Sequence, residues 1–166
     1  MKPYYEHGGV TIYHGDCREV TPVLLWVPDA IVTDPPYGMG WDTDTTRFSG
    51  GQQGHKRGRV APPIHGDDEP FDPAPWLDYE RVVLFGSNHY ANRLPVGTTL
   101  VWVKRNDKAF GSFLSDAEIA WMKGGHGVYC YRGFRTAGRT NHPTEKPVGL
   151  MRWVLGKVGD RLVLDP

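Results

Sequence analysis

The chain has 166 residues, of which 39% are hydrophobic and 23% are charged, and its formal net charge is zero. This length and composition are typical of one globular domain and exclude a chain that is disordered throughout. The zero net charge excludes a global electrostatic attraction to nucleic acid, so such contacts must come from local basic clusters. We therefore expect a single domain over residues 1–166.

The cysteines and the lack of long apolar runs favour a location in the cytoplasm. Cys17 and Cys130 are too few for a disulfide framework and lack the spacing of a metal site, which favours a reducing cytoplasm. The sequence contains no signal peptide and no apolar run of membrane-spanning length. We expect a cytoplasmic protein with no membrane partner and no metal.

The first predicted elements are a strand and a short helix. Residues 10–14 alternate between apolar and polar side chains, which predicts a strand. Asp16 follows in a turn and is placed to cap a short helix through Val20 and Leu24.

A buried strand then ends at Asp34. Ile31 and Val32 are β-branched, and Pro35 lacks the N–H that a sheet would need to continue. Strand, helix and strand form a βαβ unit, which predicts a parallel sheet. Asp34 would lie at the carboxyl end of its strand, where open α/β sheets bind their ligands.

Residues 39–75 are predicted to be a long loop. Gly, Asp, Thr, Pro and basic residues dominate there, and the apolar residues do not follow the spacing of a helix or a strand. The densest positive cluster of the chain lies here, with Lys56, Arg57 and Arg59. One interpretation is a solvated segment. The position directly after the Asp34 turn favours a substrate-contacting flap instead.

The middle of the chain predicts a short helix and four strands. Asp72 and Pro73 would be the N-cap and the first residue of the helix. The strands are residues 81–85, 98–103, 117–122 and 128–131, the last two forming an antiparallel pair joined through Gly124-Gly125. A polar loop with Arg132, Arg135 and Arg139 follows, as a second candidate phosphate-contacting patch.

The segment His142-Pro143-Thr144-Glu145-Lys146-Pro147 opens the clearest predicted helix. Thr144 can cap it and Gly159 can end it. One apolar stripe at helical spacing would consist of Val148, Met151, Val154, Leu155 and Val158. Residues 161–165 begin a further buried strand, which ends at Asp165-Pro166.

Three motifs in this order resemble a known family. The first is the segment from His14-Gly15-Asp16-Cys17 to Asp34-Pro35-Pro36-Tyr37, the second is His142-Pro143-Thr144-Glu145-Lys146-Pro147, and the third is Leu164-Asp165-Pro166. The motifs are similar to those of the amino-group DNA methyltransferases. The order is that of the circularly permuted class, and the intervening stretches look like its small orphan or phage-type members. The resemblance implies an α/β, Rossmann-like methyltransferase sheet, mostly parallel with an antiparallel hairpin, circularly permuted and incomplete at the C-terminus.

The catalytic motif fits the chemistry that the family performs. An exocyclic amine is a poor nucleophile, because its lone pair is delocalised into the ring. Asp34 and the Pro35 carbonyl can accept its N–H bonds, Pro36 stiffens the turn, and Tyr37 can stack on a base flipped out of double-stranded DNA. The methyl donor would be S-adenosylmethionine, attacked in line, with catalysis by positioning and electrostatics.

The resemblance also implies cofactor contacts. Asp16 would accept the adenine amino group of S-adenosylmethionine, although a role as a helix cap alone explains it equally well. The segment with His142, Thr144, Lys146 and Pro147 would lie against the methionine portion, where a cation can pair with the carboxylate. Asp165 would lead the cofactor-binding loop.

The chain departs from the family pattern after Pro166. Members of the family continue with a glycine-rich loop, a helix and a strand with a ribose-binding acid, and the 166-residue chain stops before them. We therefore expect either that the chain is truncated at the cofactor loop or that the missing segment comes from elsewhere. In both cases the 166-residue chain should bind S-adenosylmethionine weakly or not at all by itself.

The leading prediction is methylation of adenine N6 in DNA, because the family more often has Asp at the first motif position for that base. The alternatives are cytosine-N4 methylation, an RNA or protein N-methyltransferase, which usually has Asn before Pro-Pro-Tyr, and a non-catalytic DNA-binding remnant of the fold. The remnant would bind through the two basic clusters without transferring a methyl group, and its binding would weaken steeply with salt.

Overall fold

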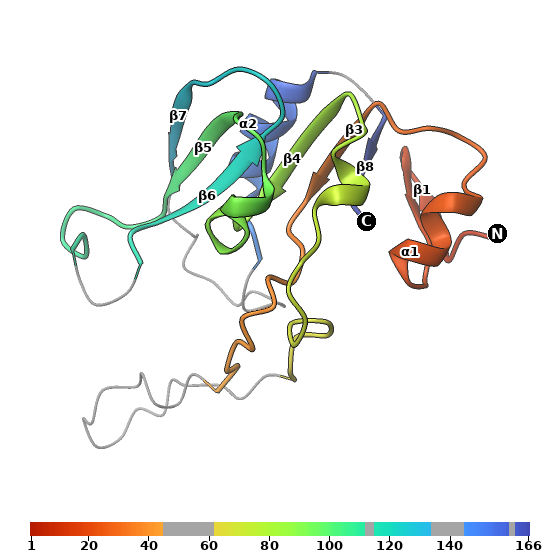
Figure 1. The fold of residues 1–166 in the computed structure, drawn as a ribbon, viewed down its shortest axis with the longest axis horizontal. Helices are drawn as coiled ribbons and strands as arrows, with labels where there is room; N and C mark the ends of the chain where they lie inside the picture. Colours follow the sequence, from red (N-terminus) through yellow and green to blue (C-terminus); the bar gives the residue numbers. More distant parts are fainter. Residues whose placement is uncertain (45–61, 112–114, 134–144, 160–161) are drawn as a thin grey trace.

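The computed structural model of the chain describes residues 1–44, 62–111, 115–133, 145–159 and 162–166. Within these ranges, the centre of the protein is a six-stranded mixed sheet in the order β7-β5-β6-β4-β3-β8 (Figure 1). Three of its five strand pairings are parallel, and β6 runs antiparallel to both of its neighbours. The sheet contains β3 (Ala30–Thr33), β4 (Arg81–Phe85), β5 (Thr98–Val103), β6 (Ala117–Met122), β7 (Val128–Arg132) and β8 (Val163–Leu164). The prediction of a mostly parallel α/β sheet is confirmed.

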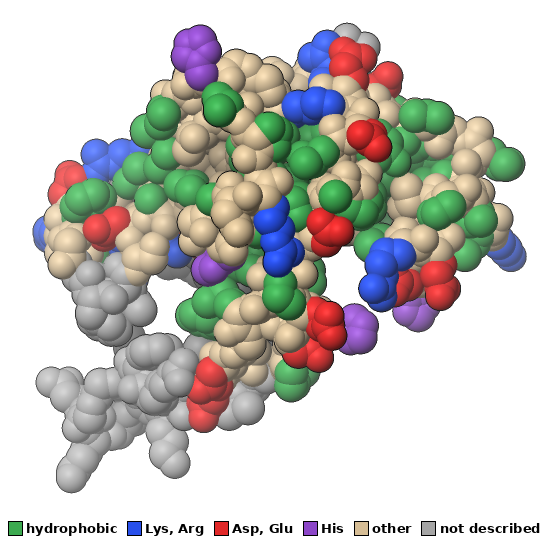
Figure 2. Space-filling model, viewed as in Figure 1, with side chains coloured by type: hydrophobic (Ala, Val, Ile, Leu, Met, Phe, Trp, Pro, Cys, Tyr) green, Lys and Arg blue, Asp and Glu red, His purple; other side chains and the backbone are tan. Residues whose placement is uncertain are grey.

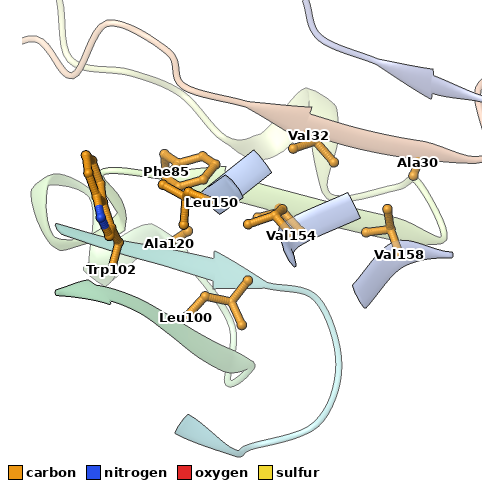
Figure 3. Packing of buried hydrophobic residues seen from close by; sticks show 10 residues of the cluster. Ala30, Val32, Phe85, Leu100, Trp102, Ala120, Leu150, Val154 and Val158 are labelled. Atoms are coloured by element: carbon orange, nitrogen blue, oxygen red, sulfur yellow. The ribbon is translucent and has the colours of Figure 1, made fainter. Parts of the chain in front are cut away.

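One face of the sheet packs against helix α2 (Val148–Val158). Successive side chains of a strand point to opposite faces, so Ala30 and Val32 of β3 face this helix. Leu150, Val154 and Val158 point from α2 toward the strands (Figure 3). This packing fixes the start of α2 against the carboxyl ends of β3 and β4.

The opposite face has its own apolar layer. Ile31, Val82 and Leu84 alternate with the residues that face α2 and are fully buried. They pack against Trp76 from the short 3₁₀ helix η3 (Ala74–Trp76) and against Tyr90, which follows the 3₁₀ helix η4 (Ser87–His89). Burial of both faces explains why β3 and β4 are continuous apolar runs in the sequence. A further 3₁₀ helix, η5, spans Ala91–Arg93.

The prediction of a βαβ unit at the N-terminus is wrong. β2 (Val10–Ile12) pairs antiparallel with β1 (Tyr5–His7) in a separate two-stranded sheet. Gly8 and Gly9 both have positive φ, the backbone of a tight hairpin turn, so the chain folds back before it can enter the main sheet. In Figure 1 this hairpin lies beyond β8. The short helix is confirmed as α1 (Cys17–Val20), followed by η1 (Thr21–Val23).

The predicted antiparallel pairing of β6 with β7 is also wrong. β5 lies between them, antiparallel to β6 and parallel to β7. The turn between β6 and β7 wraps around the start of β5, because Thr98 N–H donates to the Gly124 carbonyl at 3.0 Å and Thr99 N–H to the Gly127 carbonyl at 2.8 Å. The antiparallel hairpin of the sheet is therefore β5–β6.

The boundaries of the predicted helices shift in the structure. Thr144, the predicted cap, lies outside the described residues, and the N-cap position of α2 is held by Pro147. Gly159 ends α2, as predicted, with its N–H donating to the Leu155 carbonyl at 3.0 Å. At η3 the N-cap is Pro73, while the Asp72 carboxylate accepts the Ala74 N–H at 3.1 Å.

The apolar stripe of α2 is rotated from the predicted one. Leu150, which the prediction omitted, is 1% exposed, whereas Val148 is 67% exposed and Leu155 is 37% exposed. The contact stripe is Leu150, Met151, Val154 and Val158. Because α2 contains apolar residues on more than one face, the sequence alone does not decide which face meets the sheet.

Leu150→Ala should lower the free energy of unfolding by about 2–5 kcal/mol, because it leaves a cavity in the core. Leu155→Ala, in the same helix, serves as the matched control and should cost less than about 1 kcal/mol, since Leu155 is partly exposed. Urea denaturation of both variants measures the two values. Equal losses would contradict this packing of α2 on the sheet.

Candidate functional site

Three strands end at one edge of the sheet and bring acidic residues together. β3 is parallel to β4 and to β8, so their carboxyl ends coincide. Asp34 follows β3 directly, and Asp165 follows β8 directly. A pocket of about 410 Å³ opens at this edge. Its lining residues are Val32, Thr33, Asp34, Phe85, Glu145, Lys146, Met151 and Asp165.

The Asp34 carboxylate is held on both of its oxygens. The Tyr37 hydroxyl donates to Oδ1 at 2.5 Å, and the Lys146 ammonium donates to Oδ2. The Asp34 side chain is 29% exposed, so it remains accessible from the pocket. A carboxylate has about four acceptor positions, and a further donor can therefore add to Asp34.

Lys146 is shared between two carboxylates. Its side chain is 10% exposed, and its ammonium lies 3.3 Å from Glu118 Oε2 in addition to Asp34. Glu118 in turn accepts a hydrogen bond from Lys104 Nζ at 2.8 Å on its other oxygen. Burial raises the pKa of Glu118, but the Lys146 and Lys104 charges outweigh this and hold its pKa below the usual range. Two acids and two bases thus compensate each other beside the pocket.

Tyr37 is packed so that its hydroxyl faces Asp34. Its ring stacks on His89, with the centroids 4.8 Å apart and the planes at 10°. Burial and then the negative charge of Asp34 raise the pKa of Tyr37, so the phenol stays protonated and acts as a hydrogen-bond donor. The ring also lies directly over Gly86, the residue that follows β4.

Asp165 supplies a second carboxyl group with different properties. The residue is exposed as a whole, but the surrounding protein desolvates its carboxyl group. This desolvation raises the pKa of Asp165, and the nearby charge of Asp34 adds to the shift. A hydrogen bond from the Thr33 hydroxyl opposes the shift. The two aspartates therefore differ in environment: Asp34 is paired with a cation and a phenol, and Asp165 with a neutral hydroxyl.

The structure brings together four of the predicted site residues: Asp34, Tyr37, Lys146 and Asp165. Pro147 begins α2 beside Lys146. The Lys146 ammonium binds protein carboxylates in this structure, so its predicted contact with the cofactor carboxylate stays a prediction.

Asp16 lies outside the pocket lining. It caps α1 by accepting the Arg18 N–H at 2.9 Å, which confirms its role as a cap. Hydrogen bonds from Arg18 lower the pKa of Asp16 to about 2. The cofactor contact of Asp16 stays a prediction.

Most of the predicted DNA-contacting residues lie outside the described residues: Lys56, Arg57, Arg59, Arg135 and Arg139, as does the predicted cofactor residue His142. Arg132 is described, at the end of β7, where its guanidinium pairs with Asp107. Figure 2 shows basic and acidic side chains interspersed on the visible face, without a large patch of one sign among the described residues.

Sequence reasoning missed three contributors to the site. Lys104 and Glu118 complete the charge network, and Asp67 binds the chain just after Tyr37. The ring of His89 stacks on Tyr37. Glu118 and His89 stand in stretches that resemble the family, which was a signal for them. Asp67 carried no signal, because its partners are about 30 residues away in the chain.

No protein-family model matches the chain, and no curated protein matches it. Among the described residues, no helix combines the length and apolarity needed to cross a membrane. The same residues contain no cluster of three or more His, Cys, Asp or Glu side chains that could hold a metal ion.

Gly86→Ala should destabilise the protein and displace Tyr37. Gly86 has φ +69°, a backbone that costs an L-residue about 1–2 kcal/mol, and a Cβ there would lie 2.0 Å from Tyr37 Cε1. Gly156→Ala is the control, because that helical glycine has open space around it, and alanine should stabilise the helix by about 0.5–1 kcal/mol. Urea denaturation compares the two, and a neutral Gly86→Ala would contradict the close approach.

The pH dependence of stability should report the Glu118 network. Because the folded-state pKa of Glu118 is lowered, its contribution is complete above the unfolded pKa of about 4.3 and is lost as the pH falls through the lower folded value. Glu118→Gln should therefore lower Tm at pH 7, with a difference from wild type that shrinks below about pH 4.3.

The matched control for this measurement is Glu80→Gln. Glu80 forms an ion pair with Arg81 on the surface, with its side chain 80% exposed, and such pairs contribute little. Thermal melting from about pH 3 to pH 7 spans the range in which carboxylates titrate and gives both differences. A Glu118→Gln difference that stays constant over this range would contradict the lowered pKa.

Proposed function

We propose that this protein is an S-adenosylmethionine-dependent DNA methyltransferase that methylates the exocyclic N6 of adenine. The observation that supports this most is the placement of Asp34. Its carboxylate lies at the carboxyl end of β3, is held by the Tyr37 hydroxyl and Lys146, and lines a pocket shared with Asp165. The sequence motif at Asp34 thus coincides with a site of suitable geometry.

Asp34 is suited to activate an amino group. Each carboxylate oxygen has one donor from the protein and a further acceptor position for an N–H of the target base. Accepting that N–H draws the nitrogen toward a tetrahedral, more nucleophilic form. Lys146 and Tyr37 keep Asp34 in place meanwhile, so the charge is oriented before the base arrives.

Tyr37 is suited to hold a planar base. In this proposal the ring of Tyr37, which is fixed beside Asp34, would stack on the base next to the acceptor for the amino group. Base–aromatic stacking contributes about 1–3 kcal/mol per base. An adenine within a duplex must be flipped out to reach such a position. The Pro35 carbonyl is the second acceptor in this proposal.

The pocket fits the methyl donor in size and chemistry. Its volume of about 410 Å³ lies within the range of small-molecule sites. Val32, Phe85 and Met151 provide apolar walls, and Asp165, Glu145 and Lys146 provide charges of both signs for a zwitterionic amino-acid group. S-adenosylmethionine would supply the electrophilic methyl group there, and the protein residues would bind and orient the two reactants.

The sheet supports the proposed family. The resemblance implied a mostly parallel sheet with an antiparallel hairpin, and the observed sheet has the hairpin β5–β6 within a mostly parallel order. β3 leads to Asp34 and β8 leads to Asp165. β3 comes before β8 in the chain, yet the two strands are neighbours in the sheet. Such an order is compatible with a circularly permuted, Rossmann-like methyltransferase fold, which we propose for this chain.

Asp34→Ala should reduce methyl transfer to DNA at least about 100-fold, because one preoriented electrostatic group typically contributes that much. The measurement is incorporation of labelled methyl from S-adenosylmethionine into unmethylated DNA. Both the 166-residue chain and the full polypeptide that its gene encodes are assayed. Asp78→Ala, at an exposed aspartate, is the control and should leave the rate unchanged.

The outcomes of this assay separate the proposal from its rivals. Wild-type transfer that Asp34→Ala abolishes supports the methyltransferase. Salt-sensitive DNA binding by every form without any transfer would mean a non-catalytic remnant of the fold. Transfer that survives Asp34→Ala would show that this carboxylate is not the activating group.

A further inference from the structure

Asp67 binds the chain immediately after the catalytic turn. Its Oδ1 accepts backbone N–H groups from Tyr37 at 3.0 Å, Gly38 at 2.9 Å and Met39 at 3.3 Å, and its Oδ2 accepts the Trp41 N–H at 2.6 Å. Asp67 is 5% exposed and is the only charged residue that is buried in the part of the chain that the structure describes. One carboxylate thus satisfies four backbone donors of a short stretch.

The main chain around Asp67 strengthens this attachment. The Gly40 N–H donates to the Asp67 carbonyl at 2.8 Å. Gly38 has φ +74°, and a Cβ there would lie 2.3 Å from the Glu69 carbonyl oxygen. The segment around Asp67 therefore lies directly against the stretch that follows Tyr37, although the two are about 30 residues apart in the chain.

The chemistry of the site explains why a carboxylate is needed. Pro35 and Pro36 cannot donate, so the first donor after Asp34 is the Tyr37 N–H, and the positive φ of Gly38 prevents a regular strand. An anion that accepts several N–H groups forms bonds stronger than neutral ones. Burial raises the pKa of Asp67, but the four backbone donors outweigh this and lower it below the usual range, so it is ionised at neutral pH.

We propose that Asp67 is a positioning residue for the methyl-transfer reaction, which fixes the turn after Asp34 so that Tyr37 keeps its hydroxyl on Asp34 and its ring on His89. The inference rests on the proposed function, because positioning has meaning only if Asp34 and Tyr37 are catalytic. Among the described residues, all four hydrogen bonds of the Asp67 side chain go to this one stretch. Its action on the reaction would therefore pass through Tyr37.

Asp67→Asn is the informative substitution, with Asp68→Asn as the matched control. Asparagine keeps the size of the side chain but replaces one acceptor oxygen with a donor, so it cannot accept all four N–H groups. Asp68 is the adjacent aspartate and is exposed. A displacement of about 1 Å at a reacting group can cost 100-fold in rate. Asp67→Asn should therefore lower kcat about 10- to 100-fold, with KM for S-adenosylmethionine close to wild type.

Amide hydrogen exchange provides a readout that does not depend on activity. In the wild-type protein the amides of Tyr37, Gly38, Met39 and Trp41 should be protected, and Asp67→Asn should remove that protection while strands β3 and β4 keep theirs. Asp68→Asn should change neither exchange nor kcat. This pattern together with the loss of kcat would support the positioning role.

Three results would overturn the inference. The first is a wild-type kcat in Asp67→Asn. The second is a loss of kcat accompanied by rising exchange throughout β3 and β4, which means a general role in stability. The third is fast exchange of the four amides in the wild-type protein itself, a test that needs no variant. Absence of transfer by the wild-type enzyme would instead refute the proposed function, and exchange would still decide whether Asp67 holds the turn.

Discussion

The parallel alignment of β3 with β4 and β8 is the constraint on which the site depends. It forces the residues that follow these strands to one edge of the sheet, so Asp34, Gly86 and Asp165 lie at the same edge although they are far apart in the chain. The packing of α2 on the same strands then sets where Lys146 reaches this edge. The apolar core and the polar site are therefore consequences of one arrangement of strands.

Acidic groups gathered at such an edge repel each other unless cations lie between them. Lys146 lies between Asp34 and Glu118, and Lys104 neutralises the far side of Glu118. Asp165 has the hydroxyl of Thr33 instead. Burial and the charge of Asp34 raise the pKa of Asp165, and the hydrogen bond from Thr33 only partly opposes them. Charges that are paired in this way keep their orientation without a substrate, and an activating carboxylate benefits from being fixed in advance.

The sequence predicted the elements whose signal is local and missed those fixed by distant contacts. Strands β3 and β4 were evident from apolar runs that end in Pro35 and Gly86. The Gly8-Gly9 turn of the β1–β2 hairpin was a readable signal that the prediction overlooked. The insertion of β5 between β6 and β7, and the binding of Asp67 to the turn after Asp34, depend on pairings that no periodicity encodes.

The most direct test of the central claim is the identity of the methylated nucleoside. DNA from a host that lacks methylation is incubated with S-adenosylmethionine and the full polypeptide that the gene encodes, then digested and analysed by mass spectrometry. The account predicts N6-methyldeoxyadenosine, in an amount that falls with the Asp34→Ala variant. N4-methyldeoxycytidine would contradict the assignment of the base, and a digest without any methylated nucleoside would contradict the proposal of a methyltransferase.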